Sequence, residues 1–384
     1  MSAVPKSMPA RKPSICFLGL DNLPVLAREY NHHYIGGEPV QQTLLALAFA
    51  RRGYPVSMVI ADYGQTDGAQ WQGVRTYKAY RPGAGMPVVR FIHPRWTGLW
   101  SALKRADADV YYTSCSGAQV GQLAMFCRQH GRKLIFRSAS DADCDAELPL
   151  IKYWRDKQLY AYGLKRADAV LTQSTRQRHA MQANFGVDST VASMLVDFGT
   201  VRAFAERDID LLWVSNLRGL KRPELFLDLS EHLPRLRAHM VGGPMSAERG
   251  LFDAMQARAQ QMPQVTFNGR IAYHDVQPFY ERARILINTS DIEGFPNTYL
   301  QAWSCGVPVV SFFDPDRLIE REGLGRVPKN ADEMRAAVDE LTGDESAWQR
   351  ASERCGAFMN RAFAENTVLA TYERAVADVL GQRG

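Results

Sequence analysis

The chain has 384 residues with a formal net charge of +5, and 46% of its residues are hydrophobic. This composition can bury a substantial core, and the length suits two domains better than one. The mild positive charge fits a phosphate-bearing ligand or an anionic membrane surface, but it does not indicate nucleic acid, for which we find no recognition motif. We therefore expect a two-domain protein with no nucleic-acid partner.

The cysteines and the apolar runs predict a cytoplasmic location. Six cysteines are scattered without CxxC or His/Cys ligand spacing, which favours reduced thiols over disulfides. The stretch MSAVPKSMPARKPS lacks the apolar segment of a signal peptide. The runs TLLALAFA and VPVVSFF are far shorter than the roughly 18 to 20 residues that span a bilayer. Membrane contact, if any, is expected to be peripheral.

After a polar tail over residues 1–13, short apolar runs alternate with helical stretches. The first helical stretch, EPVQQTLLALAFARRG, has Pro39 at a first-turn position and Gly53 at its end. The runs that predict strands are SICFLGL (14–20), YPVSMVIAD, ADVYYTS (108–114), KLIFRS (133–138) and DAVLTQS (168–174). Strands that alternate with helices indicate βαβ units and a parallel sheet.

A second series of strands follows a less apolar linker, VDFGTVRAFAERD (196–208). Its members are DIDLLWVS (208–215), RAHMVGG, VTFNG (265–269), RILINTS (284–290) and VPVVSFF. We predict an N-terminal domain over 1–200, a C-terminal domain over 208–365, and a final helix within 366–384 that packs back toward the first domain. Ligands bind at the carboxyl ends of parallel strands, so the cleft between the domains is the expected site.

The first candidate binding element is IGGEP (35–39), in which Gly36 and Gly37 precede a helix. Bare backbone permits close approach of a phosphate or sugar, and a helix N-terminus offers free N–H groups and partial positive charge. A tight loop that only enters a helix would have the same sequence, because glycine pairs are common in loops.

The second element is SNLRGLKRPE (215–224), which lies between a predicted strand and a predicted helix. Arg218, Lys221 and Arg222 would together neutralise a diphosphate, through a guanidinium fork and a point charge. A solvated basic turn is the alternative.

The third element is the loop DIEGFP followed by the predicted helix NTYLQAWSCG, which Gly306 ends. Glu293 lies at the carboxyl end of the strand RILINTS, where an active-site acid is expected. The amides of Asn297 and Thr298 would be the first free N–H groups of the helix. Gln301 could contact a ligand, or it could form a T-x-x-Q capping box with Thr298.

Three acidic pairs could each hold a divalent ion, namely Asp107/Asp109, Asp141/Asp143 and Asp314/Asp316. We predict a structural role for each pair, because short acidic pairs commonly cap helices or turn the chain. Asp141 and Asp143, directly after KLIFRS, are the best placed to contact a substrate.

The segment PRWTGLWSALKR (94–105) predicts an amphipathic helix with Trp96, Leu99, Trp100 and Leu103 on one face. Basic residues flank this face, as in helices that lie on membrane surfaces. A face that packs on the core is the favoured interpretation.

These elements together resemble glycosyltransferase family 4, the retaining nucleotide-sugar enzymes of the GT-B fold. GG-E-P resembles the glycine-rich loop of the family. RADAVLTQS (166–174) resembles the segment that closes the N-terminal domain of the family's members. WVSNLRGLKRPELFL is similar to its phosphate-binding loop. NGRIAYHDVQPFYERARILINTSDIEGFPNTYLQAWSCGVPVVSF is similar to its most recognisable stretch. The resemblance covers almost the whole chain and implies an α/β protein with two doubly wound Rossmann-like domains facing across a cleft.

The resemblance also implies a role for each residue of the candidate site. Two family glutamates, with seven residues between them, correspond to Glu293 and Gln301. Glu293 would meet hydroxyls of the donor sugar, and Gln301 would hold the ribose, which needs hydrogen bonds and no charge. Lys221 matches the family's diphosphate lysine. The implied donor-binding residues are Gly36, Gly37, Asn216, Gly294, Phe295, Asn297, Thr298 and Gln301.

Two positions depart from the family pattern. Asn216 replaces an expected arginine, and Arg218 is our candidate substitute; Glu293, Lys221 and Arg218 are then the predicted catalytic residues. Ala139 replaces a histidine, and we hypothesise that Asp141 takes over part of its polar role. Asp141 and Asp143 are the candidate acceptor or sugar contacts.

The implied reaction is retaining transfer of a sugar from a UDP- or GDP-sugar to a hydroxyl of a glycan or lipid-linked glycan, in surface polysaccharide or glycolipid biosynthesis. The resemblance implies no metal or other cofactor, and peripheral contact with the inner membrane surface is expected. Three alternatives stay open: a nucleotide-sugar epimerase, a non-catalytic sugar-nucleotide-binding subunit, and a transferase whose metal is held by an acidic pair.

Overall fold

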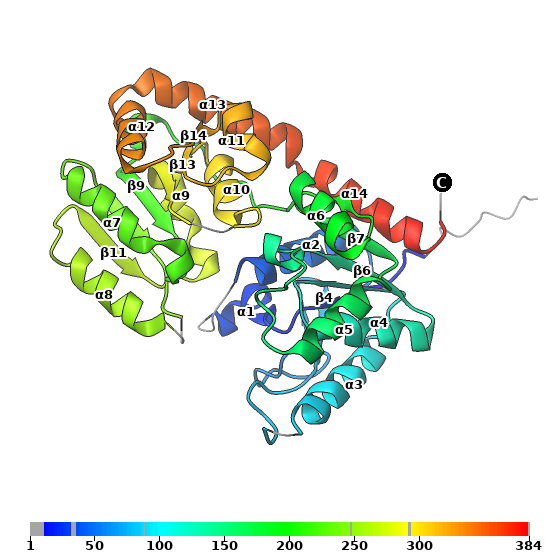
Figure 1. Cartoon of the computed structure of the whole chain (residues 1–384). Coiled ribbons are helices and arrows are strands. Elements are labelled where there is room, and N and C mark those ends of the chain that lie inside the picture. Colours follow the sequence, from blue (N-terminus) through cyan, green and yellow to red (C-terminus); the bar gives the residue numbers. More distant parts are fainter. Residues whose placement is uncertain (1–10, 32–35, 88, 246–247, 291–292, 383–384) are drawn as a thin grey trace, which may run out of the picture.

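The computed structural model describes residues 11–31, 36–87, 89–245, 248–290 and 293–382. These residues form two α/β domains that lie side by side, each built on its own twisted sheet (Figure 1). No helix within the described residues is long and apolar enough to cross a membrane.

The sheet of the N-terminal domain has the strand order β3-β4-β2-β1-β5-β6-β7-β8. Its strands are β1 (Ile15–Leu18), β2 (Val56–Ile60), β3 (Gln70–Trp71), β4 (Val74–Lys78), β5 (Val110–Ser114), β6 (Lys133–Arg137), β7 (Ala169–Thr172) and β8 (Thr190–Val191). Neighbouring strands are parallel except β3 and β4. The five strands expected from the sequence are confirmed, whereas β3, β4 and β8 were not anticipated.

Helices cover both faces of this sheet, which explains why its central strands β1, β2 and β5 are buried at every position. Ile15 and Phe17 of β1 pack with the helix α2 on one face, and Cys16 and Leu18 pack with α3 and α4 on the other. The helices of the domain are α1 (Leu23–Leu26), α2 (Gly37–Arg51), α3 (Thr97–Ala106), α4 (Ala118–His130), α5 (Trp154–Leu164) and α6 (Thr175–Phe185).

Two of the helices refine expectations from the sequence. Helix α2 begins at Gly37, which the sequence had placed in the loop before the helix, and the extended residue Gly36 is its N-cap. Leu99 and Leu103 of α3 are buried in the core, as expected for a helix face that packs on the core. Trp96, directly before α3, and Trp100 stack on each other and are only half-buried.

The sheet of the C-terminal domain is parallel throughout, with the order β11-β10-β9-β12-β13-β14. Its strands are β9 (Ile209–Val214), β10 (Ala238–Val241), β11 (Val265–Gly269), β12 (Ala283–Asn288), β13 (Val309–Ser311) and β14 (Gly325–Arg326). Its helices are α7 (Pro223–His232), α8 (Arg249–Ala259), α9 (Gln277–Arg282), α10 (Asn297–Ser304), α11 (Leu318–Glu322), α12 (Ala331–Gly343) and α13 (Glu345–Ala362). Only the two-residue β14 was not expected.

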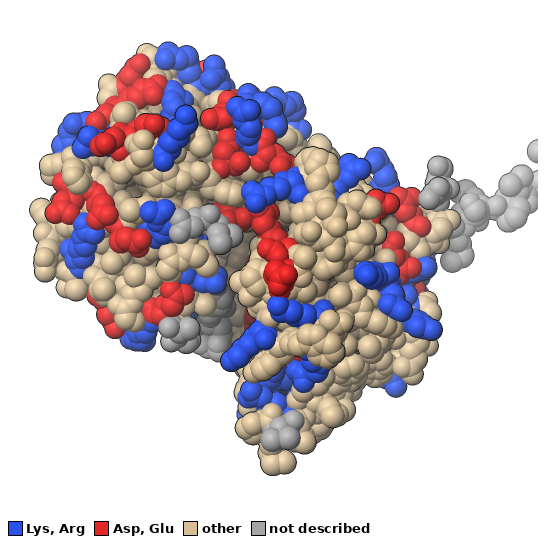
Figure 2. All heavy atoms as spheres, in the orientation of Figure 1, with Lys and Arg blue, Asp and Glu red and all other residues tan. Residues whose placement is uncertain are grey.

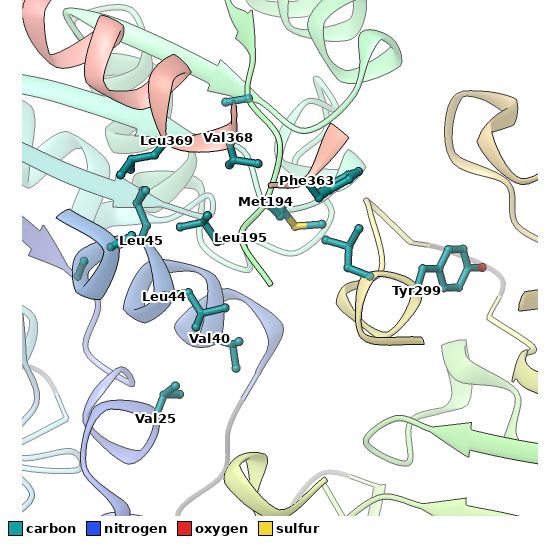
Figure 3. Packing of buried hydrophobic residues seen from close by; sticks show 14 of the residues in the cluster. Val25, Val40, Leu44, Leu45, Met194, Leu195, Tyr299, Phe363, Val368 and Leu369 are labelled. Atoms are coloured by element: carbon teal, nitrogen blue, oxygen red, sulfur yellow. The ribbon is translucent and has the colours of Figure 1, made fainter. Parts of the chain in front are cut away.

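The last helix, α14 (Glu365–Val379), crosses to the N-terminal domain and contacts α2 and β6. Figure 3 shows Val368 and Leu369 beside Leu45 of α2 and Leu195, which directly precedes the linker. At the rim, Arg52 and Glu373 form an ion pair of 3.1 Å. The hydrophobic core is therefore continuous from one domain to the other.

Candidate active site

A cavity of about 620 Å³ lies between the domains and is lined by both of them. Figure 2 shows a hollow between the two lobes at this place. One wall consists of the start of α2 and the loops after β5 and β6. The other consists of the loops after β9, β10, β11 and β12. All of these loops follow the carboxyl ends of parallel strands, where ligands bind in such sheets.

The cavity gathers nearly all of the site residues expected from the sequence. Those that line it are Gly36, Gly37, Asp143, Asn216, Arg218, Lys221, Glu293, Gly294, Phe295, Asn297, Thr298 and Gln301. Asp141 is not among the lining residues; its carboxylate accepts a hydrogen bond from Gln177 and lies 3.5 Å from Arg176. Arg222, the third cation of the basic turn, does not line the cavity either, whereas Arg270 does.

Lys221 and Glu293 form an ion pair at the C-terminal wall. Lys221 Nζ lies 2.6 Å from Glu293 Oε1, and the two side chains are only 18% and 13% exposed. Lys221 ends the 3₁₀ turn Gly219–Lys221 after β9, and Glu293 follows β12. Because β9 and β12 are neighbours in the sheet, their following loops emerge next to each other. The Thr289 hydroxyl links the two loops by donating a hydrogen bond to the backbone carbonyl of Lys221 at 2.8 Å.

Helix α10 points its N-terminus at the same cavity. It begins at Asn297, and its N-cap is Pro296, which has no side-chain acceptor. The alternative that Thr298 and Gln301 form a capping box is therefore wrong, since Thr298 already lies inside the helix. Gln301 Oε1 instead accepts a hydrogen bond from the Tyr280 hydroxyl at 3.1 Å. The first amides of α10 lack a side-chain cap, which suits the N-terminus for an anionic ligand.

Hydrogen bonds cross the cleft beside Glu293. Gln173 of the N-terminal domain accepts from the amide of Phe295 at 3.1 Å, and Asn297 Nδ2 donates to the carbonyl of Gly37 at 2.8 Å. A Cβ on Gly294 would lie 2.7 Å from the Gln173 oxygen and 3.0 Å from the carbonyl of Ala139. Gly294 is thus required by the close approach of the opposite domain.

Glu38, in the first turn of α2, lines the N-terminal wall and was not singled out from the sequence. Its carboxylate accepts a hydrogen bond from the Ser114 hydroxyl and lies 3.9 Å from Arg137 Nη1. Burial raises the pKa of Glu38 to about 7, although the Arg137 charge lowers it. Arg137 itself is 1% exposed, and its Nε and Nη2 have no hydrogen-bond partner within the described residues. The only sequence signal for Glu38 was its place directly after the glycine pair.

The raised pKa of Glu38 predicts a pH dependence of stability. Between about pH 4.5 and pH 7 the folded state holds a proton on Glu38 that the unfolded chain has released, so stability falls as pH rises through this window. Over this pH range the free energy of unfolding of the wild type should fall by up to about 3 kcal/mol because of Glu38, and Glu38→Gln should abolish this fall. Melting curves of both proteins at pH 5 and pH 8 would measure the difference. Equal pH slopes for the two proteins would contradict the assignment.

The acidic pairs have other partners. Asp143 accepts from the backbone amides of Ser116, Ala139 and Ser140, so it holds two loops of the cavity wall together. Asp107 pairs with Arg132 on the far side of the domain. The Asp314 carboxylate accepts from amides at the start of α11, and that of Asp316 from the first amides of α6 across the cleft. Within the described residues, no three His, Cys, Asp or Glu side chains are grouped so that they could hold a metal ion.

Known families account for both domains. Residues 36–195 match the model of the glycosyl transferase 4-like domain, and residues 208–344 match that of glycosyl transferases group 1. The chain belongs to the GT-B glycosyltransferases. Its two parallel-sheet α/β domains are those expected from the sequence.

Individual relatives of this GT-B glycosyltransferase are distant. A D-inositol 3-phosphate glycosyltransferase of Mycobacteroides abscessus is 27% identical over 174 residues, which are 43% of this chain and 39% of the relative. The match thus spans about two fifths of that protein. Sucrose-phosphate synthase from Thermosynechococcus elongatus has a TM-score of 0.76 at 15% identity, over 97% of this chain and 100% of that one. Anabaena HepE in complex with UDP-glucose has a TM-score of 0.71 at 14% identity, over 95% of this chain and 100% of that one.

Proposed function

We propose that this GT-B glycosyltransferase is a retaining enzyme that moves a sugar from a UDP- or GDP-sugar to a hydroxyl of a glycan or lipid-linked glycan, in surface polysaccharide or glycolipid biosynthesis. The observation that carries the proposal is the Lys221–Glu293 ion pair, which faces the interdomain cavity beside the N-terminus of α10. The solved complex of HepE with UDP-glucose, which has the same fold, supports the choice of donor class.

The leaving group of such a reaction is a nucleoside diphosphate, whose negative charge grows as the bond to the sugar breaks. Lys221, Arg218 and the first amides of α10 are the groups that would stabilise it. Fixed charges and dipoles aimed at developing charge usually make the largest contribution to catalysis. Arg270, which also lines the cavity, adds a further cation on this wall.

The ion pair itself suggests how donor binding is coupled to sugar positioning. When a diphosphate takes Lys221 Nζ, Glu293 loses its strongest partner and its carboxylate becomes free to accept hydrogen bonds from the donor sugar. The 2.6 Å between Lys221 and Glu293 supports a donor sugar that binds directly beside its diphosphate. Gln301, oriented by the Tyr280 hydroxyl, would hold the ribose through its amide.

Transfer in this proposal needs no divalent ion, because Lys221 and Arg218 supply the positive charge at the diphosphate. Addition of EDTA should therefore change the initial rate by less than about twofold. A rate abolished by EDTA and restored by Mg²⁺ or Mn²⁺ would revive the metal-dependent alternative. The matched control is a transferase of known metal dependence in the same buffer.

The proposal is tested by incubating the protein with UDP-, GDP- and ADP-sugars, each with and without lipid-linked glycan acceptors. We expect a product that forms only when an acceptor is present. Its anomeric configuration, measured by NMR, should equal that of the donor. An inverted product would contradict retention. Release of an epimer from donor alone would indicate an epimerase, and donor binding without turnover would indicate a non-catalytic subunit. A cytoplasmic location with peripheral membrane contact belongs to the same proposal.

A further inference from the structure

Exposed apolar side chains gather on one face of the N-terminal domain. Nine large hydrophobic side chains are exposed within the described ranges, and six of them come from residues 86–92 and 150–154. These six are Met86 (70% exposed), Val89 (43%), Ile92 (64%), Leu150 (64%), Tyr153 (54%) and Trp154 (75%). We call this set the docking face. Contiguous exposed apolar surface on a soluble domain commonly marks a site of interaction.

Side-chain contacts join the two segments into one surface. The Arg155 guanidinium lies over the Phe91 ring, 3.4 Å from its centroid, and 6.0 Å from the centroid of Tyr153. Phe91 in turn packs edge-on against Trp96, at 5.8 Å between centroids. Trp96 stacks on Trp100 of α3, whose buried side anchors the surface to the core.

The charge around the docking face is positive. Residues 81–104 contain four basic residues and no Asp or Glu, and residues 149–157 contain three basic residues and one acid. Figure 2 shows Lys and Arg spheres spread over the lower part of this domain, which carries the 81–96 segment and α3 in Figure 1. Exposed Trp and Tyr with a basic surround match the interface of an anionic bilayer: the rings enter the headgroup layer, and the cations meet lipid phosphates.

We propose that the docking face binds this protein to the surface of an anionic phospholipid bilayer. Leu150 belongs to the docking face and also lines the interdomain cavity, together with Pro149. Docking therefore brings the mouth of the cavity to the membrane surface. A lipid-linked acceptor can then extend its sugar into the cavity while its lipid stays in the bilayer. The delivery of a lipid-linked acceptor rests on the proposed function, whereas binding of the docking face to the bilayer is measured without donor or acceptor.

The test is co-sedimentation with phosphatidylcholine vesicles that contain about 30% phosphatidylglycerol, in about 0.1 M NaCl. The wild type should sediment with them and bind vesicles of pure phosphatidylcholine at least about tenfold more weakly. Ile92→Glu/Trp154→Glu should bind the anionic vesicles about tenfold more weakly than the wild type. Val201→Glu is the matched control, because Val201 is 56% exposed in the linker, outside the docking face, and should bind like the wild type.

A second variant keeps the test decisive if Ile92→Glu/Trp154→Glu fails to fold. Arg90→Gln/Lys152→Gln leaves every apolar side chain in place and should also weaken binding, with a smaller dependence on salt than the wild type shows. A wild type that stays in the supernatant would overturn the proposal, as would equal losses in Val201→Glu and Ile92→Glu/Trp154→Glu. The shift in melting temperature on adding UDP reports on the donor site separately, so failure of membrane binding and failure of the proposed function give different results.

Discussion

Lys221→Ala is expected to lower kcat about 10²- to 10³-fold, the usual cost of removing one group that stabilises charge in a transition state. Lys221 is the lysine that lies against Glu293 at the cavity wall, and a diphosphate leaving group would need its charge most when the sugar bond breaks. The measurement is the initial rate at saturating donor, so that a change in donor affinity does not hide the effect on turnover.

Arg222→Gln is the matched control for this variant. It removes a positive charge one residue along the chain, but Arg222 does not line the cavity. Its kcat should stay within about threefold of the wild type. A Lys221→Ala enzyme with the kcat of the wild type, or an equal loss in Arg222→Gln, would show that the diphosphate is not held by Lys221.

Glu293→Gln is expected to lower kcat by about 10²-fold while UDP binds at least as tightly as to the wild type. The substitution keeps the size of the side chain but removes the charge that pairs with Lys221 at 2.6 Å. A phosphate then no longer competes with a carboxylate for the lysine. The contacts to the donor sugar weaken, however, because an amide is a poorer acceptor of hydroxyl hydrogen bonds. Steady-state kinetics and UDP titration calorimetry measure the two effects.

The two readouts separate a role at the reacting sugar from a structural role. Asn288 also donates to Glu293 at 3.3 Å, so a purely structural carboxylate would hold its loop in place. Loss of that support would weaken UDP binding and lower the melting temperature together. Weaker UDP binding to Glu293→Gln would therefore contradict the competition between the diphosphate and Glu293.

The sequence predicted the fold well where strands are apolar on both faces. Strands β1 and β9 are buried at almost every position, because helices cover both sides of their sheets. The strands that were not anticipated lie toward the edges and are short or half-exposed. Strand β4 alternates buried and exposed residues, and β3, β8 and β14 have two residues each. Such strands are defined by pairing with a neighbour, which one local stretch of sequence does not reveal.

The candidate site shows the same division between local and long-range information. Lys221 and Glu293 lie next to each other because both follow parallel strands, which the alternation of strands and helices had indicated. Whether Gln301 takes part in a capping box of α10 depended on where the helix begins, and its N-cap is Pro296 rather than Thr298. Arg270 lines the cavity and Arg222 does not. The sequence did not reveal this, because Arg270 reaches the cavity through the position of β11 beside β10 and β9 in the sheet.

Glu38 could not have been ranked from the sequence, because its environment comes from three separate segments. Ser114 ends β5, Arg137 ends β6, and Glu38 itself belongs to α2. Their meeting in the cavity wall raises the pKa of a carboxyl that an exposed helix N-terminus would keep ionised. Buried groups of this kind depend on the tertiary structure.

The most direct test of the account is a crystal structure of the protein with UDP. The diphosphate is expected within about 3 Å of Lys221 Nζ and of the first amides of α10, with the ribose at Gln301 and the Lys221–Glu293 ion pair broken. UDP bound elsewhere, or bound in the cavity with Lys221 still held by Glu293, would contradict the assignment of this pair to the donor diphosphate and its sugar.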